Sequence, residues 1–280
     1  MNSFELLNWG KSTLGSKYGF DTKVILAHCL NIKINDVYIY SGEIKPQKSK
    51  LYKKLINARK QFIPTEYLTG DTEFMGLKYF VNKNVLIPRQ ETEILVQEAI
   101  KLVKNNKKSI NILDIGTGSG NIGISIAKYL KNVNIIAIDI SEEAIKVAIK
   151  NAKINRIQSK IKFIKSDLFN FTANYKNAKF DLIISNPPYI KTNEINRLQK
   201  EILNEPRIAL DGGKDGLKFY NSIIPESRRY LNKNGYLMLE IGYHHSKQIK
   251  KTMEANGYKN INILKDYLRQ ERVAYGQNHN

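Results

Sequence analysis

The residues with the clearest potential for chemistry are Asn186-Pro187-Pro188-Tyr189, which follow the apolar run 182–184. Such a run is typical of a buried parallel strand, and the two prolines must end it because they donate no N–H to a sheet. The asparagine is therefore held at the carboxyl end of a strand, the edge where open α/β sheets bind ligands. The amide oxygen of Asn186 and the backbone C=O of Pro187 can accept both hydrogens of a planar NH2 group. Tyr189 can cover the flat face of that group, so the motif predicts a site that aligns a weakly nucleophilic nitrogen with an electrophile.

Taken alone, this motif is equally consistent with a strand that ends in a stiff turn, but a glycine-rich stretch upstream favours a site. Asp114 ends another apolar run, and Gly116, Gly118 and Gly120 follow at alternate positions. Glycines let the backbone approach a ligand closely. The stretch also matches the dinucleotide pattern, but a carboxylate before the glycines would repel a pyrophosphate. It can instead help to hold a cationic ligand of the amino-acid type.

Two later strand ends suit the rest of such a ligand. Asp139 closes the next apolar run, at the position where a carboxylate binds ribose hydroxyls in nucleotide-binding sheets. Asp167-Leu168 closes the third run, where an adenine ring could be gripped. The pattern therefore predicts a nucleoside that carries a cationic amino-acid group.

The elements that must position these residues alternate between strand and helix from Ser109 onward, as a parallel sheet with crossover helices requires. We expect strands at 110–114, 133–139, 161–164, 180–185, 235–241, 260–264 and 272–276. We expect helices at 121–130, 141–155, 193–203, 216–231 and 246–256.

The sequence before the sheet divides into two parts. Residues 1–72 show helical patterns from Phe4, after Asp21 as an N-cap, and after Pro46. They predict either a plain helical bundle or a recognition domain. Residues 73–87 are expected to form a β-hairpin linker whose turn is Asn82-Lys83-Asn84.

The remaining part, residues 88–280, carries the sheet and opens with a helix that runs to about Val103. Arg89 and Glu91 lie in its first turn. Acidic residues there suit the helix dipole, and the alternative is that both side chains lie at the mouth of the site.

Composition narrows the class of protein. The protein has 280 residues and a net charge of +19, but lysine, asparagine and isoleucine are abundant throughout, which resembles a general compositional bias more than a nucleic-acid patch. The apolar runs are far shorter than the ~20 residues needed to span a bilayer, and no secretory signal is visible. Cys29 is the single cysteine, so no internal disulfide is possible, and the four histidines show no metal-ligand spacing. We expect a monomer in a reducing cytoplasm, without a metal.

Beyond these separate patterns, Asp114 to Gly120, Asp139 and Asn186 to Tyr189 in this order resemble the class I S-adenosylmethionine-dependent methyltransferases that act on planar NH2 groups. Two families share the last motif, the adenine-N6 methyltransferases and the protein glutamine-N5 methyltransferases. The surrounding residues resemble the second family, specifically the peptide chain release factor glutamine methyltransferases. They are Tyr67 to Gly70, Glu73-Phe74, Val85 to Arg89, Glu91 to Glu93, Glu205-Pro206, Ala209-Leu210, Gly212 to Leu217 and Glu240 to Gly242.

The resemblance implies an α/β fold of the Rossmann-like class I type, with a mixed sheet of seven strands and helices on both faces, after a helical substrate-recognition domain and a β-hairpin linker. It implies S-adenosylmethionine as the cofactor and S-adenosylhomocysteine as the product. The cofactor residues it implies are Asp114, Gly116, Thr117, Gly118, Ser119, Gly120, Asp139, Asp167, Leu168 and Asn186. The catalytic residues are Asn186, Pro187 and Tyr189, and the substrate residues are these three with Pro188, Arg89 and Glu91.

The implied reaction is methyl transfer to the glutamine amide nitrogen in the Gly-Gly-Gln motif of class 1 release factors, which modulates translation termination. The alternative is an adenine-N6 methyltransferase of DNA or RNA, which must expose its base. Such enzymes normally carry a segment that reads the target, and no basic, aromatic-rich insertion follows Tyr189. We therefore expect no sequence-specific binding of nucleic acid and no membrane partner.

Overall fold

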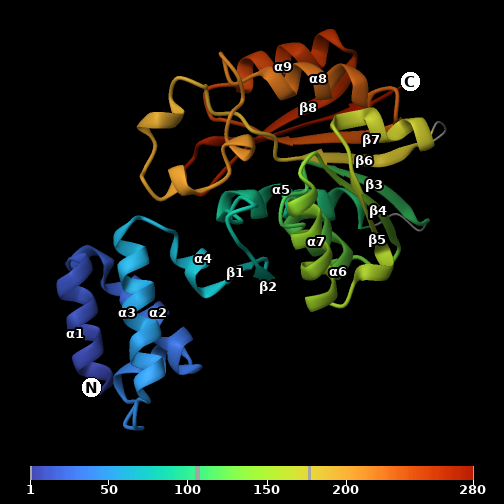
Figure 1. Cartoon of the computed structure of the whole chain (residues 1–280). Helices are drawn as coiled ribbons and strands as arrows, with labels where there is room; N and C mark the ends of the chain where they lie inside the picture. The colour runs from blue at the N-terminus through green and yellow to red at the C-terminus, as the bar shows by residue number, and fades with distance from the viewer. Residues whose placement is uncertain (1, 105–107, 176–177, 280) are drawn as a thin grey trace. The chain divides into compact units, whose positions relative to one another are not determined.

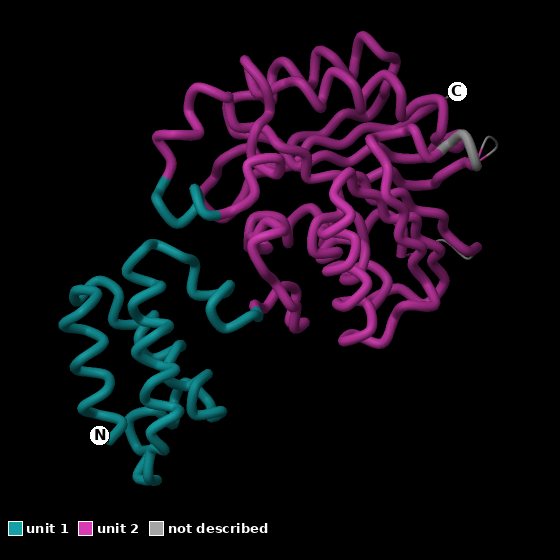
Figure 2. Tube along the Cα trace, in the orientation of Figure 1, with its two compact units in different colours: residues 1–71, 199–204 teal, residues 72–198, 205–280 magenta. Residues whose placement is uncertain are grey.

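The structure, a computed structural model, describes residues 2–104, 108–175 and 178–279. The protein divides into two compact units, and each is described by itself (Figure 2). The first unit comprises residues 1–71 and 199–204, and the second comprises residues 72–198 and 205–280. The first unit is therefore built from two separate segments of the sequence.

The first unit is helical, as predicted. Its helices are α1 (Ser3–Leu14), α2 (Gly19–Leu30), α3 (Pro46–Lys60) and α4 (Thr65–Thr69), with short 3-10 helices η1 (Ser16–Tyr18) and η2 (Ile34–Tyr38). Leu6, Ile25, Leu26 and Ile56 are fully buried in one core, so the apolar faces of α1, α2 and α3 stabilise one another.

The predicted N-cap at Asp21 is wrong. The 3-10 helix η1 leads directly into α2, which has Tyr18 at its N-cap position. The Asp21 carboxylate instead accepts from Arg59 Nε at 2.7 Å. Arg59 also donates through Nη2 to Glu201 Oε1 at 2.9 Å, and it is only 6% exposed. This ion triad ties the segment 199–204 to α2 and α3.

The second unit contains a seven-stranded sheet in the order β5-β4-β3-β6-β7-β9-β8. Its strands are β3 (Ile110–Ile115), β4 (Val133–Asp139), β5 (Ile161–Lys165), β6 (Phe180–Ser185), β7 (Leu231–Glu240), β8 (Tyr258–Lys265) and β9 (Glu271–Asn278). The first five strands in this order, from β5 to β7, run parallel to one another, and β9 runs antiparallel to both of its neighbours. This confirms the predicted mixed sheet of seven strands.

Helices cover both faces of the sheet. Since successive side chains of a strand point to opposite faces, neighbouring residues of one strand belong to different cores. In β3, Ile112 belongs to the core that includes residues of α5, α6 and α7, whereas Leu113 belongs to the core that includes residues of α8 and α9. Figure 1 shows the same division of helices between the two faces. The bounds are α5 (Gln90–Val103), α6 (Asn121–Tyr129), α7 (Glu142–Ile154), α8 (Lys218–Ser227) and α9 (Ser246–Ala255).

The hairpin before the sheet is present, but its turn lies earlier than predicted. Its strands are β1 (Asp71–Phe74) and β2 (Leu77–Phe80), joined by Met75 and Gly76 at φ 52° and 66°. Two positive φ values suit a tight hairpin turn, but methionine rarely adopts one, so the asparagines at 82–84 were the stronger sequence signal. Glu93 of α5 stabilises the turn, accepting the Met75 N–H at 2.6 Å.

The predicted helix at 193–203 is also wrong. The backbone there forms two short 3-10 helices, η5 (Ile195–Arg197) and η6 (Ile202–Asn204), and a third, η7 (Arg207–Ala209), follows. The contacts of Glu201 with Arg59, and of Asn204 Nδ2 with the Phe62 C=O at 3.1 Å, hold residues 199–204 in the helical unit. These tertiary contacts are made in place of a continuous helix.

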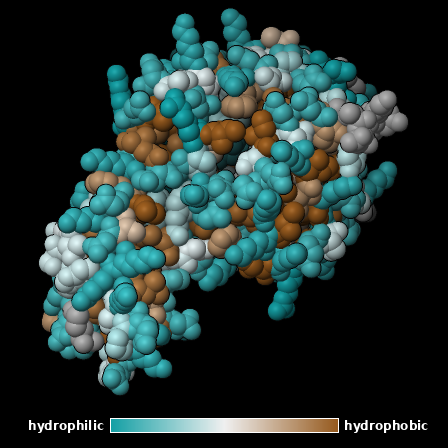
Figure 3. Space-filling model, in the orientation of Figure 1, coloured by the Kyte–Doolittle hydropathy of each residue, from teal (hydrophilic) through white to brown (hydrophobic). Residues whose placement is uncertain are grey.

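The surface agrees with the composition. Hydrophilic residues cover most of the face shown in Figure 3, and apolar residues show between them in separate patches. None of the described helices is both long and apolar enough to cross a membrane.

Candidate active site

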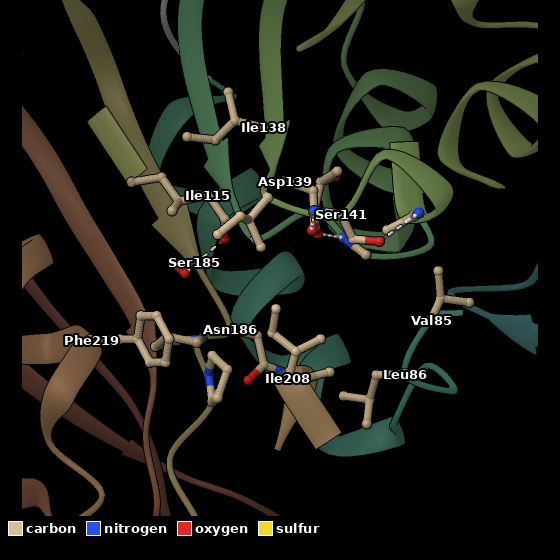
Figure 4. Close-up of a pocket in the computed structure, with 18 of the residues that line it drawn as sticks. Val85, Leu86, Ile115, Ile138, Asp139, Ser141, Ser185, Asn186, Ile208 and Phe219 are labelled. Atoms are coloured by element: carbon tan, nitrogen blue, oxygen red, sulfur yellow. Dashed lines mark hydrogen bonds between the residues drawn. The ribbon is translucent and has the colours of Figure 1, made fainter. Parts of the chain in front are cut away.

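A cavity of about 420 Å3 opens at the carboxyl ends of the parallel strands, in the second unit. The ends of strands β3, β4 and β6 contribute residues to its wall. The first turn of α5, the start of α8, and segments before α5, after β5 and before α8 contribute others. Figure 4 shows Asn186 and Phe219 across the cavity from Val85 and Leu86. This volume lies within the range of ~300–1,000 Å3 that small-molecule sites occupy.

The glycine stretch forms the loop between β3 and α6. Gly116, Gly118 and Gly120 have φ values of 69°, 55° and 82°, which residues other than glycine rarely tolerate. A Cβ atom at Gly116 would meet no atom within 4 Å, so this glycine faces open space, and it lines the cavity together with Thr117, Gly118 and Ser119. Gly120 does not line it. A Cβ there would approach Ile124 of α6 to 2.7 Å and Ala148 of α7 to 3.2 Å, so this glycine permits the start of α6 to lie close to α7.

Asp114 is fully buried beneath that loop and is not among the residues that line the cavity. Its Oδ2 accepts from Thr117 Oγ1 at 2.6 Å and from the Gly123 N–H at 3.2 Å, and so it shapes the loop. Its Oδ1 has no hydrogen-bond partner in the part of the protein that the structure describes. Burial raises the pKa of Asp114 to about 6. An unpartnered buried carboxylate oxygen suits a cation at the loop.

Asp139 lines the cavity at the end of β4, as the strand pattern predicted. Its Oδ2 accepts the Gly118 N–H and its Oδ1 accepts the Ser141 N–H, both at 2.9 Å (Figure 4). Burial raises its pKa above the ordinary value of an aspartate. Asp167 and Leu168 line the same cavity after β5. The residues predicted to hold a ribose and an adenine ring therefore surround one cavity.

Asn186, Pro187 and Pro188 also line the cavity, directly after β6. The side chain of Asn186 donates through Nδ2 to Thr92 Oγ1 at 3.1 Å, so Oδ1 is the end of the amide that can accept a hydrogen bond. The preceding residue, Ser185, anchors the strand end by donating to the Ile115 C=O at 2.8 Å. A polar acceptor thus stands on a rigid strand end.

Tyr189 does not line the cavity but packs against the core shared with α8 and α9. Its backbone is held by a neighbouring segment. A Cβ at Gly212 would approach the Tyr189 Cα to 2.7 Å, and the Gly212 N–H donates to the Ile190 C=O at 2.8 Å. Burial, with a smaller contribution from Glu240, raises the pKa of Tyr189 to about 12. Its stacking on a substrate stays a prediction.

The N-cap residue of α5, Arg89, and Thr92 in its first turn line the cavity, but Glu91 does not. Arg89 forms an ion pair with the buried Glu205. The second oxygen of Glu205 accepts the Ile87 N–H at 3.0 Å, so one carboxylate fixes both the guanidinium and the backbone before α5. Sequence reasoning gave no role to Thr92 or Glu205, although both lie in stretches that carry the family resemblance.

Metal-ligating side chains are not gathered anywhere in residues 2–104, 108–175 or 178–279, where no group of three or more His, Cys, Asp or Glu could hold a metal ion. Cys29 is buried, and burial raises the pKa of its thiol to about 11. A buried neutral thiol of this kind has a structural role.

Solved structures share the fold. The catalytic domain of hMettl16, solved in complex with the MAT2A 3′UTR hairpin 6, has a TM-score of 0.60 at 15% identity and covers 84% of this chain and 83% of its own. The Thermus thermophilus 16S rRNA N2 G1207 methyltransferase, solved with AdoMet and guanosine, has a TM-score of 0.53 at 14% identity, over 75% and 50% of the two chains. These likenesses confirm the class I methyltransferase fold.

Sequence comparisons identify the family. A model described as "Methyltransferase domain" matches residues 106–277, and one described as "PrmC N-terminal domain" matches residues 5–70. The release factor glutamine methyltransferase of Clostridium acetobutylicum is 38% identical over 94% of this chain and 93% of its own. That of Fusobacterium nucleatum is 42% identical over 90% and 71%. With the glycine loop, the carboxylates and Asn186 around one cavity, the chain belongs to the release factor glutamine methyltransferases.

Proposed function

We propose that this protein transfers a methyl group from S-adenosylmethionine to the side-chain amide nitrogen of the glutamine in the Gly-Gly-Gln motif of class 1 release factors, and so modulates translation termination. The observation that carries the proposal is Asn186, a polar acceptor on a rigid strand end that faces the same cavity as the glycine loop. Membership of the family supports the choice of a release factor as substrate. The reaction belongs to the cytoplasm, and we expect the enzyme to act as a monomer.

The residues of the cavity fit the cofactor. Asp139 lines the cavity and would accept from ribose hydroxyls, and the open side of Gly116 would leave room for the amino-acid end. Asp114 lies beneath the loop rather than in the cavity wall, and the charge of its Oδ1, unpartnered among the described residues, would favour an ammonium group near the loop. When bound, S-adenosylmethionine supplies a methyl group on a positively charged sulfur, which is the electrophile. We infer that these residues, with Asp167 and Leu168, hold it.

Asn186 and Pro187 would act on the substrate amide. An amide nitrogen is a poor nucleophile because its lone pair is delocalised into the C=O. As the nitrogen gains positive charge, its N–H groups become stronger donors, so the Asn186 Oδ1 and the Pro187 C=O bind the transition state more tightly than the ground state. A strong base is unnecessary if the acidified proton leaves late, to water. The two prolines keep the acceptors aligned before the substrate arrives.

The helical unit would serve recognition of the protein substrate. Exposed Phe20 and Tyr38 line one shallow depression with Lys11, Lys17 and Lys23. Exposed aromatic rings among lysines suit a protein partner with an acidic surface. Phe20→Ser should raise KM for the release factor several-fold and leave cofactor affinity unchanged, because the cavity lies in the other unit.

The deciding experiment is mass spectrometry of purified release factor after incubation with the enzyme and S-adenosylmethionine. One added methyl group on the glutamine of the Gly-Gly-Gln motif, absent when that glutamine is replaced by alanine, is the expected result. Duplex DNA and RNA are incubated in parallel. Methylated adenine together with an unmodified release factor would refute the proposal in favour of the adenine-N6 alternative.

A further inference from the structure

Two buried side chains, Thr92 and Glu240, form a hydrogen-bonded row with the partly buried Asn186 at the proposed acceptor site. Thr92, in the first turn of α5, is 1% exposed, and Glu240, the last residue of β7, is 2% exposed. Thr92 Oγ1 donates to Glu240 Oε2 at 2.6 Å and accepts from Asn186 Nδ2 at 3.1 Å. Asn186 follows β6, which pairs with β7, so three elements meet in this row.

The row has a direction. A threonine hydroxyl carries one hydrogen, and Thr92 uses it to donate to Glu240. Towards Asn186, Thr92 can therefore only accept, and the end of the Asn186 amide that faces it must be the NH2 group. The carbonyl end, Oδ1, is the one left for the cavity. An acceptor of substrate N–H groups must present that end.

We propose that Thr92 and Glu240 are positioning residues that select which end of the Asn186 amide faces the substrate, and that ionised Glu240 holds the acceptor end there. This deepens the proposed function, since the need for an acceptor rests on an amide nitrogen as substrate. Thr92 and Glu240 act through Asn186 rather than on the reacting atoms.

Protonation of Glu240 would reverse the row. A neutral carboxyl group can donate to Thr92, which frees the threonine hydrogen to point at Asn186. The amide then gains by turning Oδ1 towards Thr92, which presents NH2 to the cavity. A donor facing the N–H groups of the substrate repels them instead of binding them.

The surroundings of Glu240 bring this change near neutral pH. Burial raises the pKa of Glu240 to about 7. Hydrogen bonds from Thr92 and Asn186 and the positive charge of Arg272 lower this pKa, and the negative charge of Glu91 raises it. Two tyrosines also lie near Glu240. Besides burial, its charge contributes to the raised pKa of Tyr189, and the hydroxyl of Tyr220 in α8 donates to its backbone C=O at 2.9 Å. The acceptor form should therefore prevail above neutral pH and decline below it.

The first test needs no protein substrate. The side-chain NH2 resonance of Asn186 is followed by NMR between pH 5.5 and 8.5 in protein labelled with 15N at asparagine, and it is assigned by its loss in Asn186→Ala. We expect it to titrate near pH 7 in the wild type and in Thr92→Ser, which keeps the hydroxyl, but not in Glu240→Gln. A resonance that ignores pH in the wild type, or titrates equally in Glu240→Gln, would overturn the inference.

The second test uses methyl transfer to release factor, with cofactor affinity measured separately by calorimetry. Thr92→Val should lower kcat roughly 10- to 100-fold, as misplacement of a reacting group does, and Thr92→Ser should stay within a few-fold of the wild type. Glu240→Gln should lose the rise of kcat with pH around 7. If Thr92→Val had the kcat of the wild type and Glu240→Gln had its pH profile, the positioning role would be rejected and the proposed function would still stand. If the wild type methylated no release factor, the proposed function would fail. The NMR test would still decide whether Glu240 controls the orientation of the Asn186 amide.

Discussion

Replacing Asp139 by alanine removes one carboxylate with two roles. In the protein alone, it accepts the Gly118 N–H and the Ser141 N–H, both at 2.9 Å. In the proposed complex, its remaining lone pairs accept from ribose hydroxyls. The variant should therefore lower both the melting temperature and the affinity for the cofactor.

The magnitudes follow from these contacts. A hydroxyl that loses its acceptor in a closed site costs about 1–3 kcal/mol, so affinity should fall roughly 5- to 150-fold. The residues that carry the two backbone N–H groups, Gly118 and Ser141, line the cavity, where water can replace the carboxylate in part. The loss of stability without ligand should then stay near ~1–2 kcal/mol.

Calorimetric titration with S-adenosylhomocysteine measures the affinity, and a thermal scan without ligand measures the stability. Glu142→Ala is the matched control, because this nearby carboxylate is exposed and pairs only with lysines among the described residues. It should leave the affinity unchanged. Asp139→Ala with wild-type affinity would refute the assignment of this carboxylate to the ribose.

Three further changes test other parts of the molecule. Asn186→Ala should lower kcat by roughly 10² or more, with little change in cofactor affinity in calorimetry, because it removes a transition-state acceptor; an equal fall in both would argue against that role. Arg59→Ala should lower the free energy of unfolding in chemical denaturation by about 1–3 kcal/mol, because it leaves two partly buried carboxylates without their guanidinium. Lys146→Ala, which removes an exposed ion pair, is the control and should leave the unfolding curve nearly unchanged; equal effects of the two changes would contradict this. The pKa of Asp114, about 6, lies above the unfolded value of ~3.9, so the folded protein binds this proton more tightly and loses stability as pH rises from about 4 to 6. Because an asparagine cannot ionise, the stability of Asp114→Asn relative to the wild type should rise by roughly 3 kcal/mol across that pH window in thermal scans. A stability difference that does not depend on pH would count against this reasoning.

The sequence predicted the parts of the fold that depend on local pattern. Ser141 caps α7 as expected, with its Oγ accepting the Ala144 N–H at 3.2 Å. The strand ends that carry Asp139 and Asn186 were also predicted, because apolar runs and the prolines that stop them are local signals. Since parallel strands end at one edge of the sheet, these residues had to meet.

What the sequence could not predict depends on partners distant along it. Thr92 and Glu240 are 148 residues apart, and no local pattern links a threonine in a helix to a glutamate in a strand. The turn at Met75 was missed because methionine seldom adopts a positive φ. The helix expected near Glu201 was lost to an ion pair with a residue that only the fold brings close.

That ion pair bears on how the protein folds as it is synthesised. Arg59 leaves the ribosome 142 residues before Glu201, which at about 5–20 residues per second is a delay of roughly 7–30 s. Until then its guanidinium has Asp21 but not its second carboxylate. The N-terminal helices can form early, yet their unit is finished only when a segment encoded far downstream arrives. A nascent polypeptide arrested before residue 199 should therefore carry a helical unit that is more easily cleaved by protease than the same unit in the released protein.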